Sequence, residues 1–371
     1  MHILFVGDDV ALPPALDGYI SAWGDTWKIS RAGNGNEALA ALREQAVDAM
    51  IIAPHVVGAP PTMLLAQART LRPSSIRIAL IGEQHASRPP SARLVGLAHR
   101  FLPSPLEPEA LLEALSSLEE LRDLLDNEQL RTAIGRIEKL PSPPTLYIRL
   151  TEAMEQDDEV NNTQIADLVA SDPAIAAKVL QLANSVFFNT GRSISDLRTA
   201  VTRLGLSTLR DLVLASEVFS AQTLTLAERN ALQARALIAS RLAAKILPAA
   251  SAELGATAAL LSDIGMLLPG VEEQRQADTH ADSLGHIDAG AYLLGLWGLP
   301  MPIIEAVAFQ LTPQRSQMRS FWVTGAVHVA NALVRGDSVD TEYLQACGVL
   351  EKLPQWKQLA EQLTGLADTA H

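Results

Sequence analysis

Residues 258–269 read AALLSDIGMLLP. An apolar helix here runs into the pair Ser262 and Asp263, and an Ile-Gly turn follows. In a metal site we would expect a histidine before this aspartate, because imidazole and carboxylate groups together bind catalytic cations. This chain has a serine at that position. Whether this half of the chain is an enzyme therefore depends on which other side chains converge on Asp263.

The chain around this junction has the periodicity of helices. Asp172 followed by Pro173 is a good N-cap and first-turn pair. No stretch after Leu146 shows sustained alternation, so we expect an all-α domain over 139–371, ending in two short helices after Arg335. The principal helices are predicted at 226–246, 252–264, 287–297, 302–310 and 320–335.

The first half of the chain alternates short apolar runs with helical patterns. Such runs, rich in Ile and Val, suit strands buried on both faces of a parallel sheet. We therefore predict a doubly wound, flavodoxin-like α/β domain over residues 1–119. The predicted strands are 3–6, 27–32, 49–53, 76–81 and 100–105.

A leucine stripe joins the two halves. Leu111, Leu115, Leu118 and Leu125 recur at helical spacing, and the pattern continues through EQLRTAIGRIEKL until the prolines of 141–144 stop it. We interpret 120–138 as a helical linker. A helix packed on its own domain is favoured over a coiled coil, because regular heptads are few.

The composition of the chain makes some classes of function and location poor expectations. The chain has 371 residues, 48% of them hydrophobic and 19% charged, and a net charge of −13, which makes nucleic-acid binding a poor expectation. Its single cysteine, Cys347, allows no intrachain disulfide and no thiolate metal cluster. With no apolar run long enough to span a membrane, and no signal-peptide core, we expect a cytoplasmic protein.

The first half resembles the receiver domain of bacterial response regulators, through ILFVGDDV, VDAMIIAPHVVG and FLPSPLEPEAL. The resemblance places Ala53 at the phospho-acceptor position, Gly82 at the hydroxyl position and Ser104 at the lysine position. Gly7 replaces one acidic residue, which leaves Asp8 and its neighbour Asp9. Because alanine cannot attack a phosphoryl donor, the resemblance implies a pseudo-receiver that is not phosphorylated.

Two polar features of this domain have alternative interpretations. Asp8 and Asp9 form a weak cation site or, as we favour, a solvated pair that caps a turn. His55 is expected to be an exposed loop residue. Without phosphorylation, the expected role of this receiver-like domain is docking or dimerisation.

The second half resembles the HDOD family, the HD-related output domains of bacterial signalling proteins. Three motifs carry the likeness, which covers about Leu140 to Arg335: the stretch 183–215, LLSDIGMLLP, and GHIDAGAYLLGLWGLP at 285–300. HDOD domains look like relatives of the HD and HD-GYP phosphohydrolases, whose helices carry His and Asp ligands for two or more metals.

The resemblance locates a vestigial pocket, in which most metal-ligand positions hold other residues. Asp263 and His286 survive, and we expect them to hydrogen-bond to each other and to hold no metal. Met266 stands where a lysine is common, and Leu311 neighbours one lost ligand position. The vestigial pocket consists of Arg235, Ser262, Asp263, His286, Gln310 and Asn331.

Three functions fit these residues. The favoured one is a non-catalytic signalling protein that acts through protein contacts, with partners that the family resemblance implies among two-component, cyclic-di-GMP or motility proteins, and with a homodimer through the receiver-like domain or linker as an option. The second is a metal-dependent phosphohydrolase of the cyclic nucleotide phosphodiesterase type, using Asp263, His286 and further carboxylates such as Asp282 or Asp288. The third is a nucleotide sensor that binds phosphate through Arg235.

The remaining candidates have a structural interpretation. His280 and His328 are read as surface or satisfied core residues. The stretches 199–205 and 184–188 are candidate partner surfaces, but apolar residues at helical spacing favour core packing.

Overall fold

The structure is a computed structural model of the whole chain. It describes residues 1–23, 27–82, 92–125, 127–137, 162–184, 194–205, 209, 224–273, 284–316 and 320–368. The chain divides into two compact units. The first is built from residues 1–139 with 181–192 and 295–298, and the second from 140–180, 193–294 and 299–371.

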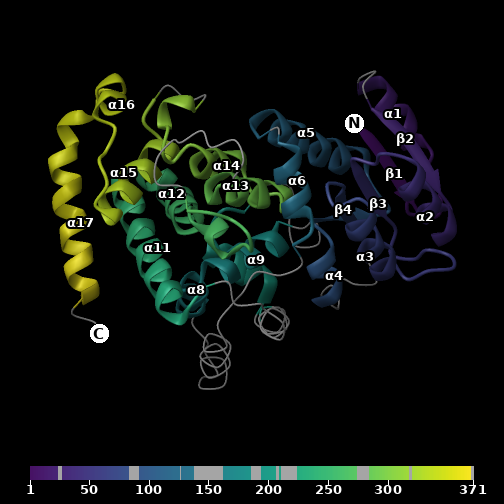
Figure 1. Cartoon of the computed structure of the whole chain (residues 1–371), viewed down its shortest axis with the longest axis horizontal. Coiled ribbons are helices and arrows are strands. Elements are labelled where there is room, and N and C mark those ends of the chain that lie inside the picture. The colour runs from purple at the N-terminus through teal and green to yellow at the C-terminus, as the bar shows by residue number, and fades with distance from the viewer. Residues whose placement is uncertain are drawn as a thin grey trace. The chain divides into compact units, whose positions relative to one another are not determined.

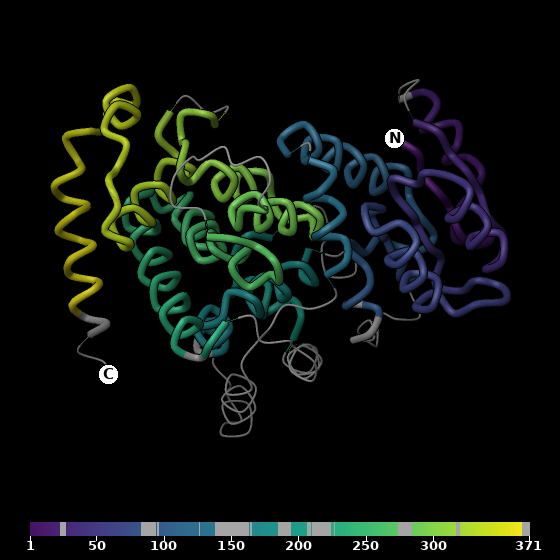
Figure 2. The backbone as a smooth tube through the Cα atoms, viewed as in Figure 1, coloured from purple at the N-terminus to yellow at the C-terminus, as the bar shows by residue number. Residues whose placement is uncertain are grey.

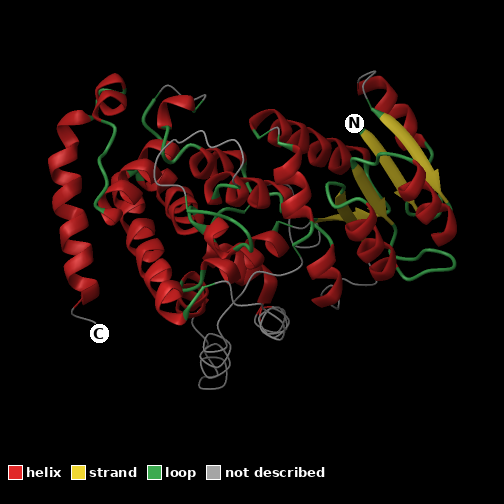
Figure 3. Ribbon diagram, viewed as in Figure 1, coloured by secondary structure: helices red, strands yellow, loops and turns green. Residues whose placement is uncertain are grey.

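The first unit contains a parallel sheet of five strands in the order β2-β1-β3-β4-β5 (Figure 3). Adjacent strands are in register so that, for example, Phe5 on β1 pairs with Ile51 on β3. The apolar runs form strands because β1, β3 and β4 are buried on both faces, as the sequence predicted. The strands are β1 His2–Val6, β2 Lys28–Ala32, β3 Ala49–Ile52, β4 Ile76–Gly82 and β5 Arg100–Ser104.

Helices alternate with these strands and form two groups by their contacts. In one group α1 packs against α5, and in the other α2 packs against α3 and α3 against α4 (Figure 1). This strand order and alternation confirm the predicted doubly wound fold. The helices are α1 Ala15–Trp23, α2 Gly35–Glu44, α3 Pro61–Leu71, α4 Ala92–Leu97 and α5 Pro108–Leu124.

The predicted leucine stripe is buried on α5, but the helix does not continue as the sequence suggested. Leu111, Leu115 and Leu118 are buried, and α5 runs across position 119 and ends at Leu124. A separate helix, α6 (Glu128–Gly135), begins where the Asn127 side chain accepts a hydrogen bond from the backbone of Leu130. The apolar pattern alone predicts one continuous helix, but the asparagine cap starts a second helix, so α5 and α6 are separate.

The described part of the second unit consists of helices and loops, as predicted. Asp172 caps α9, because its carboxylate accepts from the backbone N–H of Ala174 and Ile175. The helices are α8 Asn162–Ala170, α9 Pro173–Ala183, α11 Leu226–Ile246, α12 Ala249–Leu261, α13 His286–Leu296, α14 Met301–Ala308, α15 Val323–Arg335, α16 Thr341–Ala346 and α17 Leu353–Asp368. Within the described residues, the 3₁₀ turns of this unit are η2 Ile264–Leu267, η3 Pro313–Arg315 and η4 Leu350–Lys352.

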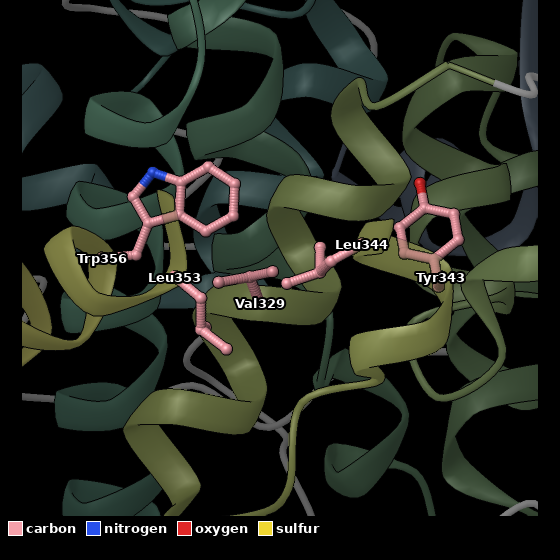
Figure 4. Close-up of a cluster of buried hydrophobic side chains, with 5 residues drawn as sticks. All are labelled: Val329, Tyr343, Leu344, Leu353 and Trp356. Carbon is pink, nitrogen blue, oxygen red and sulfur yellow. The ribbon is translucent and has the colours of Figure 1, made fainter. Parts of the chain in front are cut away.

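Helix α11 organises this unit, because it packs against α12, α15 and α17. The C-terminal helices close over α15 through a cluster of Val329, Tyr343, Leu344, Leu353 and Trp356 (Figure 4). Phe321 stacks on Trp356 with ring centroids 5.0 Å apart. The tail of the chain, yellow in Figure 2, ends in α17, which has 16 residues and is longer than the short helix predicted there.

Among the described residues, no helix has both the length and the hydropathy needed to cross a bilayer.

Candidate functional site

The carboxyl edge of the sheet brings together Gly7, after β1, and Ala53, after β3. Gly7 has φ +145°, a backbone conformation that favours glycine, and a Cβ added there would lie 2.3 Å from the Cβ of Ala53. The two small residues therefore fill the space where the receiver resemblance expects an acidic residue and a phospho-acceptor.

The neighbouring carboxylates are engaged locally. The Oδ1 atom of Asp8 accepts a hydrogen bond from the backbone of Ala11 at 2.9 Å, so Asp8 caps the turn after β1. Asp9 is exposed, with its Oδ1 atom 3.9 Å from Arg31 Nη1. Arg31 binds the Asp17 carboxylate and donates to the carbonyl of Leu12 at 2.8 Å. This pattern favours a capping pair over a cation site.

The other receiver positions are also placed. Gly82 ends β4 and Ser104 ends β5, and both are half-buried. His55 is exposed in the loop after β3, as expected.

In the second unit, two glycines bring the surviving Asp263 and His286 together. A Cβ on Gly265, in η2, would lie 1.9 Å from the carbonyl oxygen of His286, and one on Gly290 would lie 3.0 Å from the backbone nitrogen of Gly265. The motifs SDIG and GHIDAG therefore meet backbone to backbone. This close approach places Asp263, just before η2, against the first turn of α13.

Asp263 is the centre of the vestigial pocket. Its Oδ1 atom lies 3.5 Å from His286 Nε2, and Arg335 Nη2 contacts the same oxygen. Burial alone would raise the pKa of Asp263, but the hydrogen bond with His286 and the charges of Arg335 and Arg235 outweigh it and lower that pKa. Asp263 is therefore a charged carboxylate with a permanent cation bound to it.

Gln310 connects the loop after α14 to α12 and α15. Its Nε2 atom donates to the carbonyl of Ser262 at 2.8 Å, and its Oε1 atom accepts from Asn331 Nδ2 at 2.7 Å and from Arg335 Nη2 at 3.3 Å. The Ser262 hydroxyl donates to the carbonyl of Ala259 at 2.8 Å. Neutral amides and a hydroxyl thus satisfy one another where the family resemblance places metal ligands.

His328 contacts this network through the Gln310 backbone and is a satisfied buried residue, one of the two alternatives expected. Its Nε2 atom accepts from the backbone N–H of Asp340 at 2.9 Å, so the proton resides on Nδ1, which donates to the Gln310 carbonyl at 2.7 Å. Burial lowers the pKa of His328.

Arg235, on α11, differs from its neighbours because part of it has no partner. Its side chain is half-buried, and its Nε atom is enclosed without a hydrogen bond. The charge of Arg235 lowers the pKa of Asp263, so Arg235 lies near this carboxylate.

The alternative metal ligands are not assembled in the described residues. Burial raises the pKa of Asp288, in the first turn of α13, with Arg315 and His286 opposing the rise. Within the part of the chain that the structure describes, no group of three His, Cys, Asp or Glu residues is placed to hold a metal ion. His280, Asp282 and residues 185–188 lie outside the described residues.

The candidate partner stretch 199–205 lies on a helical segment whose apolar side chains are core. Ala200, Val201 and Leu204 are buried, and Thr199 and Arg203 are exposed.

Arg335 is the residue that the sequence reasoning missed. His328, Asn331 and Arg335 follow one another at spacings of three and four, which places them on one face of α15. Applied to Asn331, this helical spacing would have pointed to Arg335 as a neighbour of the pocket. Its contact with Asp263 joins residues 72 positions apart and is set by tertiary packing.

The site and fold together define a two-part protein, a receiver-type α/β unit and a helical unit whose central carboxylate is paired with arginine. Comparison with known families identifies the second part: residues 140–313 match the HDOD domain family model. This chain therefore carries an HDOD domain.

Several known proteins are similar to the chain. An uncharacterised protein of Treponema pallidum is 26% identical over an alignment of 231 residues, which covers 57% of this chain and 45% of that protein. The chain thus spans less than half the length of this relative.

Solved structures also resemble the chain. The MmoQ response regulator of Methylococcus capsulatus is 21% identical with a TM-score of 0.44, covering 59% of this chain and 98% of that one. A virulence factor of Campylobacter jejuni is 18% identical with a TM-score of 0.47, covering 62% and 90%. An HDOD protein of Geobacter sulfurreducens is 22% identical with a TM-score of 0.32, covering 67% and 95%.

Proposed function

We propose that this chain is a non-catalytic signal-transduction protein, in which a pseudo-receiver is coupled to an HDOD output domain that acts through contacts with other proteins. The observation that carries the proposal is the Arg335 guanidinium bound to Asp263. A divalent cation would have to displace a permanent positive charge from the pocket's central carboxylate, and the two cations would repel each other.

The receiver-like half supports the same proposal. Its acceptor position is Ala53, and Gly7 approaches the alanine methyl so closely that a larger side chain has no room. Phosphoryl transfer needs an acceptor carboxylate and an acidic pair to hold Mg²⁺. The signal would then enter by docking, with partners among two-component, cyclic-di-GMP or motility proteins in the cytoplasm.

The catalytic part of the proposal is tested on the full chain. We expect no stoichiometric metal in purified protein, and no phosphodiester hydrolysis with added Mn²⁺ beyond that of Asp263→Ala. Asp167→Ala, at an exposed position on α8, is the matched control. The contrary result would be stoichiometric metal together with turnover that Asp263→Ala loses and Asp167→Ala retains. That result would show that the chain is a metal-dependent phosphohydrolase.

The receiver part of the proposal is tested by mass. Intact mass spectrometry after treatment with acetyl phosphate should show an unchanged protein. A gain of one phosphoryl mass would overturn the pseudo-receiver assignment.

A nucleotide-sensing function is the second candidate, because the Nε atom of Arg235 is enclosed without a partner beside the vestigial pocket. A guanidinium binds phosphate well. Calorimetry with a small panel of nucleotides should then show binding that Arg235→Gln abolishes. Arg241→Gln, exposed on the same helix, should leave that binding intact. Flat traces with the unmodified chain would eliminate this candidate.

A further inference from the structure

One histidine joins the C-terminal helices to the loop after α14. His328, on α15, is 5% exposed. Its Nε2 atom accepts from the backbone N–H of Asp340 at 2.9 Å, and its Nδ1 atom donates to the carbonyl of Gln310 at 2.7 Å. Asp340 is the residue before α16, so the imidazole ties the C-terminal segment 340–368, which contains α16 and α17, to the network around Gln310.

Asp340 fixes the first turn of α16 in two ways. Its Oδ1 atom accepts from the backbone N–H of Tyr343 at 2.9 Å and so caps the helix, while its own backbone N–H donates to His328. The same segment packs against α15 through the cluster of Val329, Tyr343, Leu344, Leu353 and Trp356 (Figure 4). The start of the segment is therefore held by polar contacts as well as by apolar packing.

Protonation would affect the two hydrogen bonds of His328 differently. A neutral imidazole with its proton on Nδ1 accepts at Nε2, whereas both nitrogens of an imidazolium are donors. The bond from Nδ1 to the Gln310 carbonyl survives this change. The bond at Nε2 is lost, because two donors, Nε2–H and the N–H of Asp340, would then face each other. Protonation thus loosens the side of His328 that holds α16.

The groups around His328 act in the same direction. Burial lowers the pKa of His328, and the Gln310 hydrogen bond and the charge of Asp340 oppose this effect without cancelling it. Tyr343 faces the imidazole edge-on, with ring centroids 6.4 Å apart, and burial raises the pKa of its phenol, which stays neutral. A protonated His328 would attract the Asp340 carboxylate and so compete with the cap of α16.

We propose that His328 is a pH-sensitive latch for the C-terminal segment 340–368. In its neutral form it holds the start of α16 on α15, and in its protonated form it releases that turn while its bond to Gln310 remains. The latch does not depend on the proposed signalling function, because its contacts join elements within the helical unit.

The direction of the switch follows from linkage. The closed segment encloses a ring whose pKa is lowered, and opening returns the ring to water, where its pKa is about 6.5. The open form therefore binds more protons than the closed form. The closed form is favoured above about pH 6.5 and loses stability as the pH falls from there toward the pKa of the closed form.

Hydrogen exchange of the full chain, followed by mass spectrometry, tests the latch. Exchange is compared at about pH 7.5 and about pH 5.5, after correction for the intrinsic exchange rates. We expect peptides from α16 and α17 to open up to about tenfold more often at the lower pH, because one pH unit below the pKa of the open form changes a one-proton equilibrium by at most that factor. Peptides from α12 and α14 should keep their protection.

His328→Gln cannot titrate, so in this variant the opening of α16 and α17 should be equal at the two pH values. His55→Gln, at an exposed loop position, is the control and should keep the response of the parent chain. The latch would be overturned by a pH response that persists in His328→Gln, by loss of protection that extends to α12 and α14, or by unchanged exchange in the parent chain.

Should His328→Gln fail to fold, nitrogen NMR of the parent chain labelled at histidine provides a second measurement. His328 should carry its proton on Nδ1 at about pH 7.5, and its titration should coincide with the opening of α16. A proton on Nε2 at that pH, or a titration of His328 without opening, would contradict the proposal.

Discussion

At the scale of single residues, the chemistry of the helical unit depends on one carboxylate and its cation. Asp263 is 9% exposed and shares its Oδ1 atom between His286 and Arg335. Such a pair adds little net stability compared with apolar residues, but removing one partner strands a buried charge. The partners of Asp263 are therefore more informative to mutate than its distant neighbours.

The first prediction concerns Arg335→Met. The change leaves Asp263 buried beside His286 without its guanidinium, so we expect the free energy of unfolding to fall by about 3 kcal/mol. Denaturant titration followed by circular dichroism measures this loss, and adding Asp263→Asn should recover part of it. A variant within about 0.5 kcal/mol of the parent would show that the ion pair is not formed.

The second prediction concerns pH and His328. Burial lowers the pKa of this imidazole in the folded state, whereas the unfolded value is about 6.5. Below that value the unfolded chain binds more protons than the folded chain, so stability is present above about pH 6.5 and is lost as pH falls through the folded pKa. Protonation would also abolish acceptance by Nε2 of the Asp340 N–H.

Unfolding titrations between about pH 7.5 and 5.5, the range in which histidine titrates, measure this dependence. His328→Gln should flatten it, and His55→Gln, at an exposed loop position, should leave it unchanged. Parallel pH profiles for His328→Gln and the parent chain would contradict the assignment.

At the scale of elements, backbone contacts between glycines decide which motifs meet. Gly265 in η2 and Gly290 in α13 approach closely: Gly265 has no room for a side chain, and a Cβ on Gly290 would lie 3.0 Å from the backbone nitrogen of Gly265. This contact joins the end of α12 to the start of α13 and presents Asp263 to His286. The motifs SDIG and GHIDAG are thus two halves of one packing contact.

The third prediction follows from this contact. A Cβ at position 265 would lie 1.9 Å from the His286 carbonyl oxygen, so Gly265→Ala must separate η2 from α13. We expect a loss of about 1–3 kcal/mol in the free energy of unfolding, the range typical of overpacking. Gly365→Ala, exposed on α17 with no atoms near its Cβ position, should be neutral or slightly stabilising. Equal stability of the two variants would refute the close contact.

The elements themselves were largely predictable. The five strands were predicted to within about two residues, and α11 was predicted at its observed bounds. For β1, β3 and β4 the reason is that burial on both faces leaves uninterrupted apolar runs. Errors occurred where side chains compete with the backbone. Asn127 starts a new helix in the linker, and the Ser262 hydroxyl bonds back to Ala259 where α12 gives way to η2.

At the scale of the whole molecule, charge and architecture limit the kinds of partner. The net charge of −13 repels phosphate backbones, and Asp8 and Asp9 add an acidic turn at the carboxyl edge of the sheet. Binding to nucleic acid depends on cationic side chains that replace counterions. Protein partners remain the expectation for both units.

The fourth prediction is therefore an absence of nucleic-acid binding. Fluorescence anisotropy with labelled duplex DNA and single-stranded RNA at about 0.15 M salt should show no change as the full chain is added. Saturable binding at micromolar protein concentrations would require a basic surface that the overall charge does not suggest.

The sequence alone determined the doubly wound and all-helical architecture, because periodicity and local capping are short-range properties. The assignment of residues to the receiver positions, and the expectation that Asp263 pairs with His286, came from the family resemblances. Only the tertiary structure decided that Arg335 binds Asp263, that Gln310 joins Ser262 to Asn331, and that His328 joins the C-terminal segment to this network. These arrangements depend on contacts between residues far apart in the chain, where packing selects one partner among many that the same pattern allows.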